Sequence, residues 1–124
     1  MKIFLDTNFL IYCIQQKIPF IEQIEEKIHE KYELIVLDKV MNELEMIKSR
    51  SNIKEKQAAK LALDLIKSSK NFKIIRGEGK NADDSLVEFD YKDVVIASLD
   101  RELRKRFKNA CFLTIKRKKY LDFI

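Results

Sequence analysis

The chain has few of the residues that break or cross-link regular structure: two glycines, one proline, two cysteines and one histidine among 124 residues. So few glycines and prolines exclude collagen-like repeats and low-complexity linkers, and 46% hydrophobic residues suffice for a buried core. Cys13 and Cys111 have neither the spacing nor the histidine neighbours of a zinc site. We therefore expect a folded chain that needs neither a disulfide nor zinc.

Long apolar segments are also missing. No apolar run approaches the roughly 20 residues that a membrane-spanning helix needs, and the opening Met-Lys-Ile-Phe-Leu-Asp lacks the pattern of a signal peptide. We expect a cytoplasmic protein with no membrane partner. Its length suits a single domain of residues 1–124, in which residues 116–124 form a basic and aromatic tail.

The charge of the chain is basic, with 25 Lys and Arg against 20 Asp and Glu and a net charge of +5. Such a surplus suits a partner that carries phosphate, because Lys and Arg displace the counterions of nucleic acids. The alternative is a basic protein with no such partner, and charge alone does not decide between them.

Short apolar runs alternate with longer amphipathic segments along the chain. The runs lack the alternation of a half-exposed strand, which indicates strands buried on both faces of a parallel sheet. Their alternation with helices predicts a three-layer α/β fold with right-handed crossovers. We expect strands at 3–5, 34–37, 72–75, 94–97 and 111–115, and helices that include 53–68, 82–91 and 100–107.

Acidic residues stand where predicted strands end. Asp6 follows the first strand, and Asp100 follows the fourth after Ser98-Leu99. Asp83 and Asp84 open the helix before the fourth strand, and Glu43 lies in the helix after the second. In open parallel sheets, ligands bind outside the carboxyl ends of the strands. These segments are therefore expected to bring their carboxylates to one edge of the sheet.

Carboxylates gathered in this way repel one another and raise one another's pKa, and a bound divalent cation removes that cost. Ligation by oxygen alone favours Mg²⁺ or Mn²⁺, one ion or two, over zinc. Such ions activate water and polarise a phosphodiester, which is the chemistry of a nuclease. Asn8 and Ser98 are candidates for positioning a water or fixing the turn.

Each acid also has a simpler explanation. Asp6 is suited to cap the first helix, Glu43 to pair with Lys39 or Lys48 on its own helix, and Asp83 and Asp84 to favour a helix dipole. Their joint placement at strand ends is what favours a shared site.

Four segments resemble the motifs of the PIN-domain ribonuclease family, in the same order. They are Ile3–Asn8, Val40–Leu44, Ala82–Val87 and Ala97–Leu103. The details are most similar to the Fcf1-like nucleases of ribosomal-RNA processing and to archaeal VapC toxins. The resemblance implies a five-stranded parallel sheet, cleavage of single-stranded RNA with Mg²⁺ or Mn²⁺, frequent homodimers and, for a toxin, an antitoxin partner.

The resemblance also implies roles for single residues. Asp6, Glu43, Asp84 and Asp100 match the catalytic acids, while Asp83 and Glu102 are further candidate metal ligands. We favour Asp84 over Asp83 because Ser85-Leu86-Val87 follows it, as small and apolar residues follow the acid of the family. The basic residues expected to hold RNA phosphates are Arg101, Arg104, Lys105 and Arg106.

One position departs from the pattern. Leu99 stands where the family usually has Asn or Asp before the fourth acid, which removes a polar group beside the site. It keeps open the alternative of a weak or inactive PIN domain that serves as a scaffold for RNA or protein. The tail of residues 116–124 is expected either to follow an RNA backbone or to dock its aromatic residues on the body.

Overall fold

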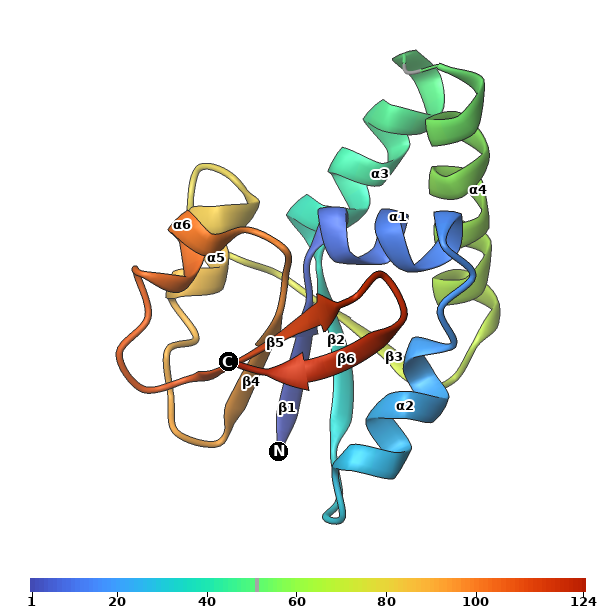
Figure 1. The fold of residues 1–124 in the computed structure, drawn as a ribbon. Helices are drawn as coiled ribbons and strands as arrows, with labels where there is room; N and C mark the ends of the chain where they lie inside the picture. Colours follow the sequence, from blue (N-terminus) through green and yellow to red (C-terminus); the bar gives the residue numbers. More distant parts are fainter. Residues whose placement is uncertain (51) are drawn as a thin grey trace.

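A computed structural model describes residues 1–50 and 52–124. Its centre is a six-stranded sheet with the order β3-β2-β1-β4-β5-β6 (Figure 1). The first five strands in sequence are parallel and the sixth is antiparallel. The strands are β1 (Lys2–Leu5), β2 (Glu33–Leu37), β3 (Phe72–Ile75), β4 (Val94–Ala97), β5 (Cys111–Lys116) and β6 (Tyr120–Phe123).

Helices flank the sheet, as the sequence predicts for an α/β fold. Figure 1 shows α1 to α4 gathered on one side of the sheet and α5 and α6 on the other. The helices are α1 (Thr7–Gln15), α2 (Phe20–Lys27), α3 (Asp38–Arg50), α4 (Ile53–Ser68), α5 (Ala82–Val87) and α6 (Arg101–Arg104). The predicted bounds of α4 are confirmed. The Asn52 side chain caps the start of this helix by accepting from the Glu55 amide at 3.0 Å. The last two helices are shorter than predicted.

The sixth strand corrects the prediction of five strands and a tail. The turn between β5 and β6 places Arg117 and Lys118 at positive φ, 53° and 58°, as the central residues of a type I′ turn require. Such turns favour Asn-Gly or Asp-Gly, and the sequence here has Arg-Lys instead, so it does not indicate a hairpin. Leu121 of β6 is fully buried. Part of the tail is therefore a strand of the sheet.

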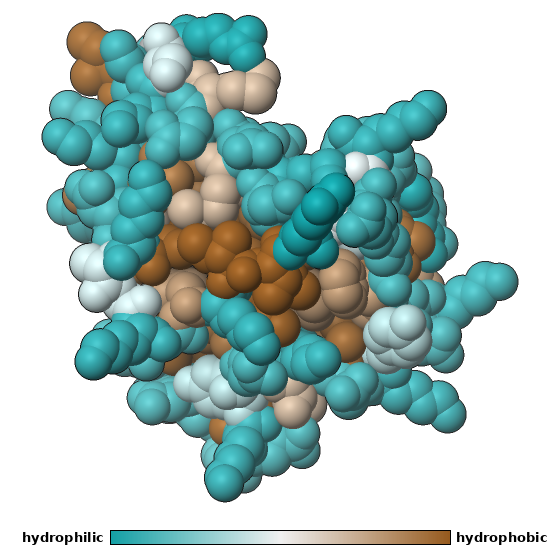
Figure 2. All heavy atoms as spheres, turned by 180° about the vertical axis from the view of Figure 1, so that it is seen from behind, coloured by the Kyte–Doolittle hydropathy of each residue, from teal (hydrophilic) through white to brown (hydrophobic). Residues whose placement is uncertain are grey.

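The core follows the apolar runs of the sequence. Every residue of β4 and all but the first of β1 and β2 are buried, which confirms strands covered on both faces. The sheet is less covered at β3, where Ile74 is 49% exposed. Figure 2 shows polar side chains around an apolar area on the rear face. Among the described residues, no helix is long and apolar enough to cross a membrane.

Candidate functional site

Asp6 lies where β1 ends beside the end of β4. Its amide donates to the Ala97 carbonyl at 2.9 Å, so the backbone pairing of the two strands continues to this residue. The Asp6 side chain is 4% exposed. Its Oδ1 accepts from the Thr7 amide at 2.8 Å, and its Oδ2 accepts from the Ser98 hydroxyl at 2.7 Å. Asp6 is thus the N-cap of α1 and also a fixed carboxylate at the sheet edge.

Burial is the main reason why the pKa of Asp6 is raised, from 3.8 to about 6. The hydrogen bonds from Ser98 and Thr7 lower this pKa, whereas the negative charges of Asp83 and Glu43 raise it further. Desolvation and like charges therefore outweigh the two hydrogen bonds. A carboxylate in this position gains from any cation that approaches it.

Glu43 points from α3 toward the same place. Its Oε1 accepts from the Thr7 hydroxyl at 2.6 Å, across 36 positions of sequence. Lys39, one of the partners expected for Glu43 on the helix surface, donates instead to the Gly77 carbonyl. Thr7 therefore contacts two acids, Asp6 through its amide and Glu43 through its hydroxyl. Thr7 is not among the site residues predicted from the sequence.

The turn after β4 is tied to the start of α1. Asn8 Oδ1 accepts from the Leu99 amide at 3.3 Å and from the Ser98 hydroxyl at 3.4 Å. The Ser98 oxygen accepts from the Asp100 amide at 3.1 Å. Asp100 caps α6 through Oδ1, which accepts from the amides of Glu102 and Leu103. One Asp100 oxygen is thereby occupied with holding its own helix.

The two acids that open α5 point to different neighbours. Asp83 lines the same cleft as Asp6 and Asp100, and burial followed by the charge of Asp100 raises its pKa. Asp84 instead forms an ion pair with Arg106 at 2.8 Å. The placement therefore favours Asp83 over Asp84 as the acid that α5 contributes to the cleft.

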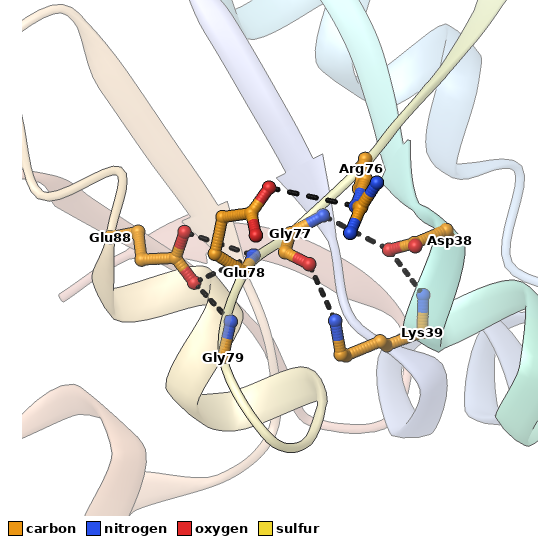
Figure 3. Close-up of polar contacts among 7 residues, drawn as sticks. All are labelled: Asp38, Lys39, Arg76, Gly77, Glu78, Gly79 and Glu88. Atoms are coloured by element: carbon orange, nitrogen blue, oxygen red, sulfur yellow. Dashed lines mark hydrogen bonds and ion pairs between the residues drawn. The ribbon is translucent and has the colours of Figure 1, made fainter.

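The loop before α5 is held by carboxylates from two elements, as Figure 3 shows. Asp38 at the start of α3 accepts from the Gly77 amide at 3.0 Å, and this hydrogen bond is the main reason why the pKa of Asp38 is lowered. Glu88 accepts from the amides of Glu78 and Gly79, the latter at 2.6 Å. The backbone of residues 77–79 is thus fixed from both sides.

Both glycines of the chain are in this loop, and both are needed there. A Cβ on Gly77 would lie 2.4 Å from the Cβ of Ser85, and one on Gly79 would lie 2.5 Å from the Ser85 amide nitrogen. The loop backbone therefore packs directly on α5.

The carboxylates of Asp6, Glu43, Asp83 and Asp100 border a cleft of about 520 Å³, called the acidic cleft below. Glu55 of α4 also lines it, an acid that sequence reasoning missed because it resembles an ordinary first-turn residue. Half-buried apolar groups and exposed Gln15 complete the wall. The lining residues are Asp6, Thr7, Asn8, Ile11, Tyr12, Gln15, Glu43, Ile47, Glu55, Asp83, Leu99 and Asp100.

The donors of the acidic cleft fit a hard divalent cation in kind. Its acidic lining groups are the carboxylates of Asp and Glu, and no His or Cys among the described residues lines the cleft. Within residues 1–50 and 52–124, no three His, Cys, Asp or Glu side chains are close enough together to hold a metal ion as they are oriented. Ligation therefore requires some of these carboxylates to turn toward one another.

The remaining predicted site residues lie outside the acidic cleft. Glu102 is exposed and pairs with Lys105 at 3.1 Å, and Arg106 pairs with Asp84. Arg101, Arg104 and Lys105 line a second cleft, called the basic cleft below. The structure thus brings together Asp6, Asn8, Glu43, Asp83 and Asp100, with Ser98 bonded to Asp6, whereas the predicted RNA-binding residues do not line this cleft.

Comparison with known proteins agrees with this fold and motif order. The family model of the PIN like domain matches residues 3–119. The chain therefore belongs to the PIN-domain family. Among curated proteins, it is 35% identical over 127 residues to Ribonuclease VapC4 of Methanocaldococcus jannaschii. The aligned region covers 98% of this chain and 95% of that protein.

Two solved structures extend the comparison. The PIN domain endonuclease Utp24 matches with a TM-score of 0.76 and 25% identity, over 98% of this chain and 90% of that one. VapBC2 from Rickettsia felis, solved bound to a DNA fragment from its promoter, matches with a TM-score of 0.60 and 17% identity. It covers 94% of this chain and 100% of the matched chain, and at that identity it supports the fold alone.

Proposed function

We propose that this protein is an endoribonuclease that hydrolyses phosphodiester bonds of single-stranded RNA with one or two Mg²⁺ or Mn²⁺ ions. The observation that carries the proposal is the buried Asp6 carboxylate, which faces the negative charges of Glu43 and Asp83 at the carboxyl ends of parallel strands. A bound cation offsets that repulsion. The names of the relatives support the same activity, because VapC4 is a ribonuclease and Utp24 an endonuclease.

The proposed ligand set is Asp6, Glu43, Asp83 and Asp100. Asp83 replaces Asp84, because the carboxylate of Asp84 is engaged by Arg106. Glu102 stays outside the set, since its exposed carboxylate pairs with Lys105. When bound, a divalent ion supplies an activated water and a polarised phosphoryl oxygen.

The chain's own groups hold the ligands in place. The Ser98 hydroxyl and the Thr7 amide orient the two oxygens of Asp6, and the Thr7 hydroxyl orients Glu43. Asn8 ties the Leu99 amide to the start of α1 and so keeps the two strand ends together. Because Asn8 bonds the backbone of Leu99, the apolar side chain at this position leaves that contact intact.

The biological role proposed is that of a toxin ribonuclease in the cytoplasm, with a protein antitoxin as its partner. The 35% identity with Ribonuclease VapC4 over nearly the whole chain supports this role over ribosomal-RNA processing. A homodimer remains a prediction of the family resemblance.

The test is cleavage of a mixed-sequence single-stranded RNA by the wild type, Asp6→Asn and Asp64→Asn. Asp64 is an exposed residue of α4, so it matches the chemical change away from the acidic cleft. We expect cleavage in Mn²⁺ or Mg²⁺, none in EDTA, and a loss of about 100-fold or more for Asp6→Asn, typical of removing a preorganised charged group. Cleavage that persists in EDTA, or that Asp6→Asn leaves intact, contradicts the proposal.

A further inference from the structure

The basic cleft has a volume of about 570 Å³, within the range of small-molecule sites. Four cationic side chains line it, and no Asp or Glu side chain from the described part of the chain does. Its walls come from α6, the segment before β5, β5 itself and the end of the chain. The lining residues are Arg101, Arg104, Lys105, Phe107, Ala110, Phe112, Thr114, Ile115, Lys116 and Ile124.

The cations of this cleft are available to an anion. Lys105 and Lys116 form exposed ion pairs with Glu102 at 3.1 Å and Asp122 at 3.6 Å, and exposed pairs of this kind are weak. Arg101 and Arg104 have no ion-pair partner within the described ranges. A guanidinium binds a phosphate through two parallel hydrogen bonds, which makes arginine well suited to nucleic acids.

The floor of the basic cleft is apolar and fixed. The rings of Phe107 and Phe112 lie 5.9 Å apart between centroids, and Phe112 is 3% exposed. One wall is held by Asp90, whose carboxylate accepts from the amides of Lys108, Asn109 and Ala110, each at 2.8 Å. The cleft therefore exists before any ligand binds.

The basic cleft adjoins the acidic cleft along the chain. Asp100 lines the acidic cleft, and the next residue, Arg101, lines the basic one. A strand with one phosphodiester in the acidic cleft therefore has a short path over the beginning of α6 to the arginines.

We propose that the basic cleft binds one nucleotide of a single-stranded RNA, at a position removed from the bond that is cut. The phosphate lies against Arg101, Arg104 and Lys116, and the base packs on the floor at Phe107. An acidic peptide would use the same cations but would leave the apolar floor uncovered. The inference rests on the proposed function for the identity of the strand, whereas the binding itself needs neither metal nor cleavage.

Binding is measured in EDTA by fluorescence anisotropy with a labelled oligouridylate, over a series of salt concentrations. The variants are Arg104→Gln and Lys116→Gln, and the control is Lys60→Gln, which removes an exposed charge on α4. Each lost phosphate contact lowers the slope of log binding constant against log salt by about 0.7 for single strands. We expect that decrease for Arg104→Gln and Lys116→Gln, and an unchanged slope for Lys60→Gln.

A second variant tests the apolar floor without changing charge. Ala110→Trp fills the cleft, and we expect it to weaken oligouridylate binding about 10-fold while the salt slope and the cooperative thermal melt are retained. If that variant does not fold, Ile115→Gln makes the same floor polar and is expected to weaken binding in the same direction. The inference is overturned if the Arg104 and Lys116 variants behave like Lys60→Gln, or if a polyglutamate peptide competes as well as unlabelled RNA.

The two proposals fail separately. RNA that binds through the basic cleft without being cut in Mn²⁺ contradicts the proposed function and supports this inference. The opposite outcome is metal-dependent cleavage together with RNA binding that the Arg104 and Lys116 substitutions leave unchanged. It supports the proposed function and overturns this inference.

Discussion

The acidic and basic clefts are lined by the consecutive residues Asp100 and Arg101, yet different features of the chain build them. Asp6 is buried and bonded to both Thr7 and Ser98, so the pairing of β1 with β4 determines its position. Arg104 and Lys116 are long, exposed side chains on a short helix and an outer strand. In the acidic cleft the fold keeps carboxylates close together although they repel one another. In the basic cleft the charged groups stand at the ends of long, flexible side chains. Substitutions are therefore expected to have larger effects in the first cleft than in the second.

The sharpest contrast is expected within a single helix. Glu43 and Glu45 both lie on α3, but Glu43 accepts from Thr7 in the acidic cleft and Glu45 pairs with Lys67 on the surface. We expect Glu43→Gln to lower RNA cleavage about 100-fold, because it removes a charge aimed at the reacting groups. Glu45→Gln should stay within about twofold, as exposed ion pairs contribute little. Initial rates in Mn²⁺ measure both, and equal losses would remove Glu43 from the site.

The buried charge of Asp6 should also be visible in stability. Its folded pKa of about 6 lies above the ordinary 3.8, so the folded protein holds a proton more tightly than the unfolded chain does. The tighter proton binding contributes to the free energy of unfolding. This contribution is fully present below pH 3.8 and is lost as the pH rises through 6. The rise of the Asp6 pKa from 3.8 to about 6 corresponds to a contribution of about 3 kcal/mol to the free energy of unfolding.

The measurement is urea unfolding in EDTA between pH 4 and pH 8, for the wild type and Asp6→Asn. We expect the wild type to lose free energy of unfolding across this range relative to the variant, which cannot ionise there. Added Mn²⁺ should restore part of the loss at high pH. Parallel pH profiles for the two proteins would show that Asp6 is not a strained, buried charge.

A smaller effect should separate the neighbours on α5. Asp83→Asn removes a carboxylate from the acidic cleft, whereas Asp84→Asn breaks an ion pair with Arg106 that is partly exposed. We expect Asp83→Asn to lower cleavage about 10-fold more than Asp84→Asn. The reverse order, measured as initial rates under the same conditions, would restore Asp84 as the ligand.

The same contrast explains what the sequence could predict. Apolar runs specify buried parallel strands, and the rule that ligands bind at their carboxyl ends was enough to predict that Asp6, Glu43 and Asp100 lie close together, as they do in the acidic cleft. The choice between Asp83 and Asp84 depends on the rotation of α5 in its tertiary packing, which includes the close approach of Gly77 and Gly79 to that helix. No pattern within the helix carries that information.

Other features depend on contacts between distant segments. Glu55 reaches the acidic cleft from α4 and Thr7 contacts Glu43 across 36 positions, so neither has a local signal. The strand β6 was missed because Arg117 and Lys118 adopt positive φ without the residues that favour it. Tertiary packing compensates for an unfavourable turn when a residue such as Leu121 becomes fully buried.

Titration calorimetry with Mn²⁺ tests the central claim most directly, because it measures the cation that the buried carboxylates are proposed to hold. The account predicts that the wild type and Asp64→Asn bind one or two Mn²⁺ ions with the same affinity. It predicts that Asp6→Asn binds them at least about 10-fold more weakly, as loss of metal-site groups does. Mn²⁺ binding by Asp6→Asn with the wild-type affinity would contradict it.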